Sequence, residues 1–210
     1  MSFEQGWQLF VEGLTNATWY ETVAVIAGIV SVWLGKKENV LVFPIGLINT
    51  ITFIYISAKA HLYGEASLNL YYTLVSIYGW MLWTRTNTQH QKLLHITRST
   101  AREWTFHLLL FAMFYLVVYA ALVYLKKDFA PGAIPWADAF ASATAYTAMW
   151  LMAKKKLESW LWWIATNIAS IPLFFVKGYM VTMVQFVFLL VLAFMGYASW
   201  RRKAFAQNRN

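Results

Sequence analysis

The chain has 210 residues, of which 60% are hydrophobic, 19% aromatic and 12% charged. Soluble domains carry roughly 25% charged residues, so this composition excludes an ordinary soluble core and indicates a protein that lies in lipid. The absence of cysteine excludes disulfides and cysteine-based metal sites. The net charge of +8 is divided into short clusters between apolar runs, which excludes a nucleic-acid-binding face. We expect the lipid bilayer among the partners of the chain, and no nucleic acid.

The N-terminal segment, residues 1–18, lacks the basic stretch that opens a cleaved signal peptide. Its apolar side chains share one helical face: Phe3, Trp7, Phe10, Val11 and Leu14. Such a face is typical of a helix that lies in the membrane interface. We expect an interfacial helix here, with a disordered terminus as the alternative.

Seven apolar segments follow, each close to the roughly 20 residues that cross a bilayer as a helix. In chain order they are 19–35, 39–58, 66–84, 105–125, 136–153, 159–177 and 179–200. Polar turns separate them, and the longest, 85–104, is expected to be a cytoplasmic loop. The predicted fold is an all-α membrane protein with seven transmembrane helices and a cytoplasmic tail at 201–210.

The basic residues predict how these helices are oriented. Seven spans place the termini on opposite sides, and the loops on the N-terminal side contain only Lys59, Lys126, Lys127 and Lys177. The other side carries Lys36, Lys37, Arg85, Lys92, Arg98, Arg102, Lys154, Lys155, Lys156, Arg201, Arg202, Lys203 and Arg209. Cytoplasmic loops are enriched in Lys and Arg. We expect a multi-pass protein of the inner (plasma) membrane, with the N-terminus outside and the C-terminus in the cytoplasm.

An internal repeat relates the first three spans to the last three. Like residues stand 117 positions apart: Trp19 and Trp136, Trp33 and Trp150, Gly79 and Gly196, Trp83 and Trp200. The repeat predicts two three-helix units, 19–84 and 136–200, that cross the membrane in the same direction. A linker helix at 105–125 joins them. In transporters built this way the substrate site is expected near mid-membrane, where the units meet.

The stretch WLWWIATN, from Trp160 to Asn167, is the first candidate for that site. At 100° per residue, Trp160, Trp163 and Asn167 share one face of a helix. An indole one turn from an amide suits a flat polar ring, which stacks on the tryptophan and hydrogen-bonds to the asparagine. We interpret Trp160 and Trp162 as tryptophans of the cytoplasmic membrane interface. For Asn167 the alternative is a hydrogen bond that only holds helices together.

Other polar residues at depth extend the candidate site. Asn49, the repeat mate of Asn167, either lines the same site or is a structural twin. Asn69 and Tyr72 follow one stripe of the third span, and Gln185 occupies roughly the place of Asn69 in the seventh. Each alone is explained by a structural role, but their convergence from several helices predicts an uncharged polar cavity.

Ionisable side chains are absent from the middle of every predicted span, although ion-coupled carriers usually place them there. Glu21 and Asp138 open the first and fifth spans, where a carboxylate stabilises the helix dipole or forms part of an external gate. The four histidines are scattered, and no nucleophile–base pair is visible. We therefore predict no enzymatic activity, no cofactor and no metal site. A membrane receptor or assembly subunit stays open as another class, and so does a homo-oligomer.

Three motifs resemble the nicotinamide riboside transporters of the PnuC type: FPIGLIN at 43–49, IYGWMLW at 77–83 and ESWLWWIATN at 158–167. That family is similar in plan to the SWEET proteins, with the same 3+1+3 helix count. The resemblance implies facilitated diffusion of nicotinamide riboside without ion or ATP coupling, and trapping by phosphorylation in the cytoplasm. It also implies an aromatic–amide site, which maps to Trp163, Asn167 and Asn49. Thiamine or riboflavin, carried by relatives of the family, is the alternative substrate.

Overall fold

A computed structural model describes residues 3–89, 93–124 and 132–207, which are mostly helical. The helices are α1 (Phe3–Thr15), α2 (Trp19–Lys36), α3 (Val42–Lys59), α4 (Tyr63–Thr84), α5 (Ala101–Tyr124), α7 (Pro135–Ala153), α8 (Ser159–Val176) and α9 (Met180–Gln207). The predicted all-α class is confirmed for this part of the chain. Lys92, Lys126, Lys127 and Arg209, which enter the charge count, lie outside the described residues, as do residue 125 and the Phe3 side chain.

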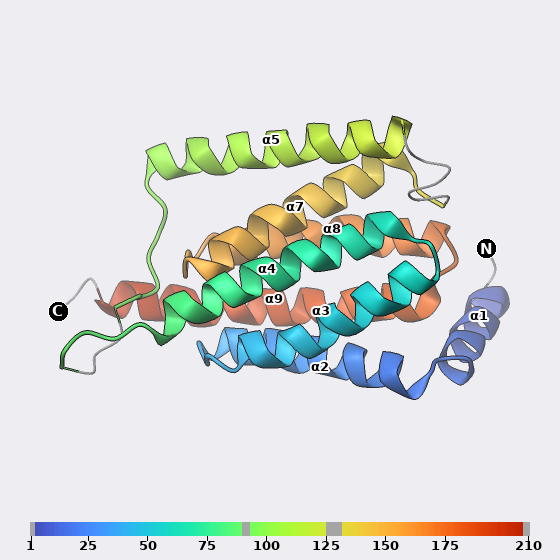
Figure 1. Ribbon diagram of the computed structural model, residues 1–210, viewed down its shortest axis with the longest axis horizontal. Helices are drawn as coiled ribbons and strands as arrows, with labels where there is room; N and C mark the ends of the chain where they lie inside the picture. Colours follow the sequence, from blue (N-terminus) through green and yellow to red (C-terminus); the bar gives the residue numbers. More distant parts are fainter. Residues whose placement is uncertain (1–2, 90–92, 125–131, 208–210) are drawn as a thin grey trace.

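Six helices form a closed ring made of two halves, and their axes run side by side in Figure 1. The first half is α2–α4 and the second is α7–α9, with each helix packed against the next in its half. The halves join where α4 contacts α7 and where α9 contacts α2. Helix α5 lies outside the ring against α7, and α1 lies across one end. The centre of the ring is therefore the place where the halves face each other.

Four helices, α3, α5, α8 and α9, are long and apolar enough to cross a membrane, and counting the bent pair α1–α2 gives five. The sequence predicted seven spans. Helix α7 is rich in alanine and threonine, and its Ala139, Thr144 and Thr147 are at most 1% exposed. A helix shielded in this way does not need an apolar surface toward lipid. On α5, by contrast, Leu109 and Leu116 are 65% and 64% exposed, as expected of a surface that faces lipid.

The turns of the two halves share a left-handed backbone conformation. Glu38 and Lys155 follow α2 and α7 with φ of 63° and 51°, and His61 and Gly178 follow α3 and α8 with φ of 57° and 80°. In each turn a backbone N–H returns to the last turn of the preceding helix, a common C-terminal cap. Both pairs are 117 residues apart. The next helices begin at the same spacing, α3 and α8 at Val42 and Ser159, and α4 and α9 at Tyr63 and Met180.

Two segments outside the ring pack against it. Helix α1 occupies the N-terminal segment that was predicted to be interfacial, and its Trp7 and Leu14 are 59% and 52% exposed. The segment before α5 was predicted to be a polar loop, yet its Ile96 is buried in the core. Ser99 also donates hydrogen bonds from its N–H and Oγ to the Glu158 carboxylate (2.9 and 2.7 Å). Helix α5 therefore begins at Ala101, and the segment before it is fixed to the turn that opens α8.

Candidate functional site

The centre of the ring encloses a cavity of about 110 Å³. All six ring helices line it, through Ser31, Val32, Gly35, Val42, Phe43, Ser76, Met149, Met152, Trp160, Trp163, Asn167, Leu189 and Ala193. None of these side chains is ionisable. Ligand pockets usually enclose roughly 300–1,000 Å³. A nucleoside-sized ligand would therefore require the two halves to move apart.

Trp163 and Asn167 lie together in this cavity, as their spacing on one helical face predicts. The Asn167 side chain is 3% exposed and lines the cavity. Its amide can both donate and accept hydrogen bonds, so it can bind a polar ligand there. Tyr72 is not among the cavity-lining residues, but its ring centroid lies 6.1 Å from that of Trp163. The cavity thus presents aromatic rings and one amide.

Asn49, which lies 118 residues before Asn167, has a different environment. Its Nδ2 donates a hydrogen bond to the backbone carbonyl of Ala24 on α2 (2.8 Å). The amide packs against Gly28, where a Cβ would lie 2.9 Å from Nδ2. Asn49 therefore links α3 to α2 within the first half and is not among the cavity-lining residues. At the 117-residue spacing of the helix starts, the position equivalent to Asn49 is Thr166. The two asparagines are therefore one residue out of register and face different directions, about 100° apart around the helix.

Asn69 and Gln185 also lie away from the cavity lining. The Asn69 amide donates to the Glu65 carbonyl of its own helix (2.9 Å). Gln185 is half-buried on α9. Of the six residues that the sequence proposed for binding, the structure brings together Trp163, Asn167 and Tyr72.

An aromatic cluster closes one end of the cavity, formed by Phe43, Trp83, Trp160 and Trp200. In the first half the ring of Phe43 meets Trp83 edge-on at 5.0 Å. In the second half Trp160 meets Trp200 edge-on at 5.6 Å. These positions correspond at the 117-residue spacing, so the two halves contribute equivalent pairs.

Trp160 and Trp162 are not interfacial tryptophans, and that interpretation of the sequence is wrong. Trp160 is 1% exposed because Gly196 on α9 lets its ring approach the backbone. Trp162 packs against α5, with its ring 5.3 Å from that of Phe111. Trp160 belongs to a buried cluster with Ile96 and Leu157, from the segments before α5 and α8. Trp162 is covered by helix α5.

Replacing Gly196 by alanine should destabilise the protein. A Cβ at this position would lie 2.5 Å from the Trp160 ring, and forcing an extra carbon into a packed core typically costs about 1–3 kcal/mol. Gly132→Ala is the matched control, since no atom lies within 4 Å of a Cβ built there. Thermal melting in detergent should show a lower midpoint for Gly196→Ala alone. Equal midpoints for the two variants would contradict this packing.

Hydrogen bonds and ion pairs join the halves just beyond the aromatic cluster. Trp83 Nε1 of the first half donates to the Ala153 carbonyl of the second (3.1 Å), and Trp200 Nε1 of the second donates to the Gly35 carbonyl of the first (3.0 Å). The bonds are reciprocal, because each third helix binds the end of the other half's first helix.

An inter-half ion network of Glu38, Lys155 and Lys203 completes this closure. Lys155 Nζ lies 2.7 Å from one Glu38 oxygen and Lys203 Nζ lies 2.9 Å from the other. Lys155 is 1% exposed and also donates to the Leu94 carbonyl (2.9 Å). Burial acts to raise the pKa of Glu38, but the hydrogen bonds from both lysines outweigh it and hold that pKa below its ordinary value. The carboxylate is therefore charged at neutral pH and ties the halves together.

The opposite end of the ring has no ion pair between the halves among the described residues. Glu21 accepts hydrogen bonds from the N–H and Oγ of Thr18, a capping box at the start of α2. Asp138 accepts a hydrogen bond from the Ile134 N–H and pairs with Lys177 (2.6 Å). Ile134 directly precedes α7 and Lys177 directly follows α8, so all three residues belong to the second half. Neither carboxylate bridges the halves, so neither forms a closed gate in this conformation.

Glu38 and Lys155 were not among the site residues predicted from the sequence. Both lie in lysine-rich turns, which predict the orientation of the helices but no site. Their 117-residue spacing was nevertheless available, and it places opposite charges at equivalent turns of two repeats. Residues near a pseudo-symmetry axis meet their own counterparts, so this pattern could have predicted the contact.

Comparison with known proteins identifies the family. The sequence profile of the nicotinamide mononucleotide transporter family matches residues 18–202. The chain belongs to this family. It is 26% identical over 209 residues to the nicotinamide riboside transporter PnuC of Escherichia coli, covering 90% of this chain and 87% of the other. It is 23% identical over 183 residues to the riboflavin/roseoflavin transporter RibM of Streptomyces davaonensis, covering 87% and 84%.

A solved structure shares the fold. The crystal structure of the vitamin B3 transporter PnuC superposes with a TM-score of 0.74 at 24% sequence identity, covering 97% of this chain and 89% of that one. The predicted PnuC-type family is confirmed.

Proposed function

We propose that the chain is a membrane carrier for nicotinamide riboside that works by facilitated diffusion. The observation that carries this proposal is the central cavity, where Trp163 offers a stacking plane one turn from the Asn167 amide. Nicotinamide riboside presents a flat, positively charged pyridinium ring with a carboxamide. The ring suits an indole face, and the carboxamide can both donate to and accept from an asparagine.

The lining of the cavity favours the riboside over its phosphorylated form. A phosphate dianion needs cationic partners when it leaves water, and the cavity lining contains no Lys, Arg or His. The riboside alone would therefore cross, and phosphorylation by a cytoplasmic kinase would trap it. Because phosphorylation in the cytoplasm keeps the riboside inside the cell, transport itself needs no ionisable residue in the membrane-spanning helices.

The architecture that best serves this function is seven spans in a 3+1+3 plan. Helices α2–α4 and α7–α9 would be parallel repeats, with α5 as the linker. The shared left-handed turns, the 117-residue helix spacing and the reciprocal tryptophan hydrogen bonds support this plan. Alternating access would then rest on movement of one half against the other around the central cavity.

In this plan the end closed by the inter-half ion network faces the cytoplasm. The charge distribution supports this orientation, because the lysine-rich turns of Glu38 and Lys155 belong to the basic side. A tag placed after Asn210 should be protected from external protease in intact cells, whereas one placed before Ser2 should be cleaved. Cleavage of both tags, or of neither, would contradict the seven-span count.

Transport should run down the substrate gradient and ignore ion gradients. With no ionisable side chain lining the cavity, proton or sodium movement has no group to couple to. Proteoliposomes loaded with buffer should fill with labelled nicotinamide riboside up to the external concentration and no further. Accumulation above that concentration under an imposed proton or sodium gradient would overturn facilitated diffusion, and riboflavin and thiamine serve as alternative substrates in the same assay.

A further inference from the structure

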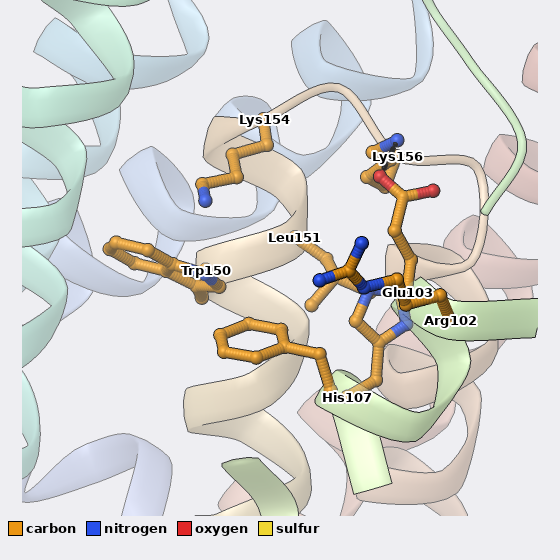
Figure 2. A pocket seen from close by; sticks show the side chains of 8 residues that line it. Arg102, Glu103, His107, Trp150, Leu151, Lys154 and Lys156 are labelled. Atoms are coloured by element: carbon orange, nitrogen blue, oxygen red, sulfur yellow. Dashed lines mark ion pairs between the residues drawn. The ribbon is translucent and has the colours of Figure 1, made fainter. Parts of the chain in front are cut away.

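A second pocket lies outside the helical ring, between the start of α5 and the end of α7 (Figure 2). It encloses about 330 Å³ and shares no lining residue with the central cavity. Its polar lining consists of Arg102, Glu103 and His107 from α5 and Trp150, Lys154 and Lys156 from α7 and the turn after it. The volume falls within the roughly 300–1,000 Å³ of small-molecule pockets.

The pocket lining contains more cationic side chains than carboxylates. Lys156 pairs with the Glu103 carboxylate (2.5 Å), which also accepts a hydrogen bond from the Thr100 N–H (2.8 Å). Lys154 Nζ lies over the Trp150 ring, 4.4 Å from its centroid, as Figure 2 shows. Among the described residues neither Arg102 nor Lys154 has a carboxylate partner. The pocket lining therefore carries an excess of positive charge.

Two buried polar atoms in the same pocket also have no partner. His107 is 3% exposed, and its Nδ1 makes no hydrogen bond to any described residue. The Trp150 Nε1–H is likewise buried and unpaired. Buried polar groups are normally satisfied, and the indole nitrogen can only donate, while a histidine nitrogen can donate in one tautomer. The unmet hydrogen-bonding capacity of the pocket therefore calls for an acceptor.

We propose that this pocket binds a phosphate group through Arg102, Lys154, His107 and Trp150. A guanidinium presents a planar fork that matches two phosphate oxygens, and a lysine adds a compact charge. The single carboxylate is neutralised by Lys156 and so does not repel the anion. The phosphate can come from a lipid headgroup or from a soluble phosphomonoester, because both present the same oxygens.

The test uses the full chain in phosphatidylcholine nanodiscs, titrated by calorimetry with inorganic phosphate and with nicotinamide mononucleotide. In parallel, native mass spectrometry counts phosphatidylglycerol retained from mixed bilayers. The variant is Arg102→Gln/Lys154→Gln, and the control is Lys36→Gln/Arg202→Gln, which removes the same charge from the same end of the bundle outside the pocket. His107→Leu removes one hydrogen-bonding group without changing the cationic pair.

The pocket variant should bind the phosphate probe on the order of tenfold more weakly, since hydrogen bonds to charged groups are lost, and His107→Leu should weaken it less. The control should stay within about twofold. Retention of phosphatidylglycerol alone would identify a lipid headgroup site, and binding of the soluble probes would identify a phosphomonoester site. The proposal is overturned if wild-type protein binds none of the probes, or if the control loses as much binding as the pocket variant.

Discussion

Replacing Glu38 by leucine should produce the largest loss of stability of any single substitution in the inter-half ion network. Lys155 is 1% exposed and would lose the carboxylate that pairs with its charge. Breaking a buried ion pair by removing one member typically costs about 3–5 kcal/mol, because the remaining charge is uncompensated. Leucine, like glutamate, is not β-branched, so the left-handed backbone at this position is not further strained.

Two further variants separate the ion pair from a general effect of losing a carboxylate. Glu12→Leu, on the exposed face of α1, should leave the melting midpoint in detergent nearly unchanged. The double variant Glu38→Leu/Lys155→Met removes both buried charges and should recover much of the lost stability. A double variant as unstable as Glu38→Leu would show that the pair is not coupled.

The same ion network sets an acid limit on stability. The pKa of Glu38 in the folded protein lies below its ordinary value of 4.5, because hydrogen bonds from Lys155 and Lys203 outweigh the effect of burial. Its contribution is therefore fully present above pH 4.5 and is lost as the pH falls through the lowered folded-state pKa. As the pH is lowered below 4.5, the melting midpoint of the wild type should fall faster than that of Glu38→Leu/Lys155→Met. Above pH 4.5 the two midpoints should change with pH in parallel.

Trp163→Ala and Asn167→Leu should each weaken the binding of nicotinamide riboside while leaving the protein folded. Losing a stacked aromatic costs about 0.5–1.5 kcal/mol beyond the area it buries. A hydrogen bond left unmade by a buried polar group costs roughly 1–3 kcal/mol. At about 1.4 kcal/mol per tenfold, each change should lower affinity by between a fewfold and about a hundredfold. Calorimetric titration of the purified variants, with melting curves alongside, measures both quantities.

Asn49→Leu is the matched control, because it makes the same chemical change at an asparagine of the other half that does not line the cavity. Its amide holds α3 to the Ala24 carbonyl of α2, so this variant should melt at a lower temperature with unchanged affinity per folded molecule. The opposite ranking, with affinity lost in Asn49→Leu and kept in Asn167→Leu, would move the site to the first half. Unaltered affinity in both Trp163→Ala and Asn167→Leu would remove this face of α8 from the site.

Much of the helix pattern could be predicted from the sequence because it is set by local signals. The apolar runs that follow the lysine-rich turns predicted the bounds of α3 and α8 to within a few residues. The 117-residue spacing of like residues recurs in the starts of the helices. The shared face of Trp163 and Asn167 follows from helical periodicity alone. Their arrangement at the cavity was therefore predictable before any tertiary contact was known.

Features that depend on packing between distant segments were not predictable in this way. The burial of Trp160 requires Gly196 on another helix, and Asn49 is satisfied by a carbonyl 25 residues earlier. The phosphate-binding candidate combines Arg102 with Lys154, which belong to helices that periodicity treats separately. Asn69 and Gln185 do not line the cavity, because the direction in which a helical stripe faces depends on how the helices pack together.

Counterflow in proteoliposomes tests the central claim most directly. Vesicles preloaded with unlabelled nicotinamide riboside receive a trace of labelled riboside outside, without any ion gradient. Wild-type protein and Asn49→Leu, normalised to folded protein, should exchange the label, Asn167→Leu should exchange it much more slowly, and unlabelled nicotinamide mononucleotide should not compete. Absence of exchange by the wild type, or equal exchange by Asn167→Leu and the wild type, would contradict a riboside carrier built on this cavity.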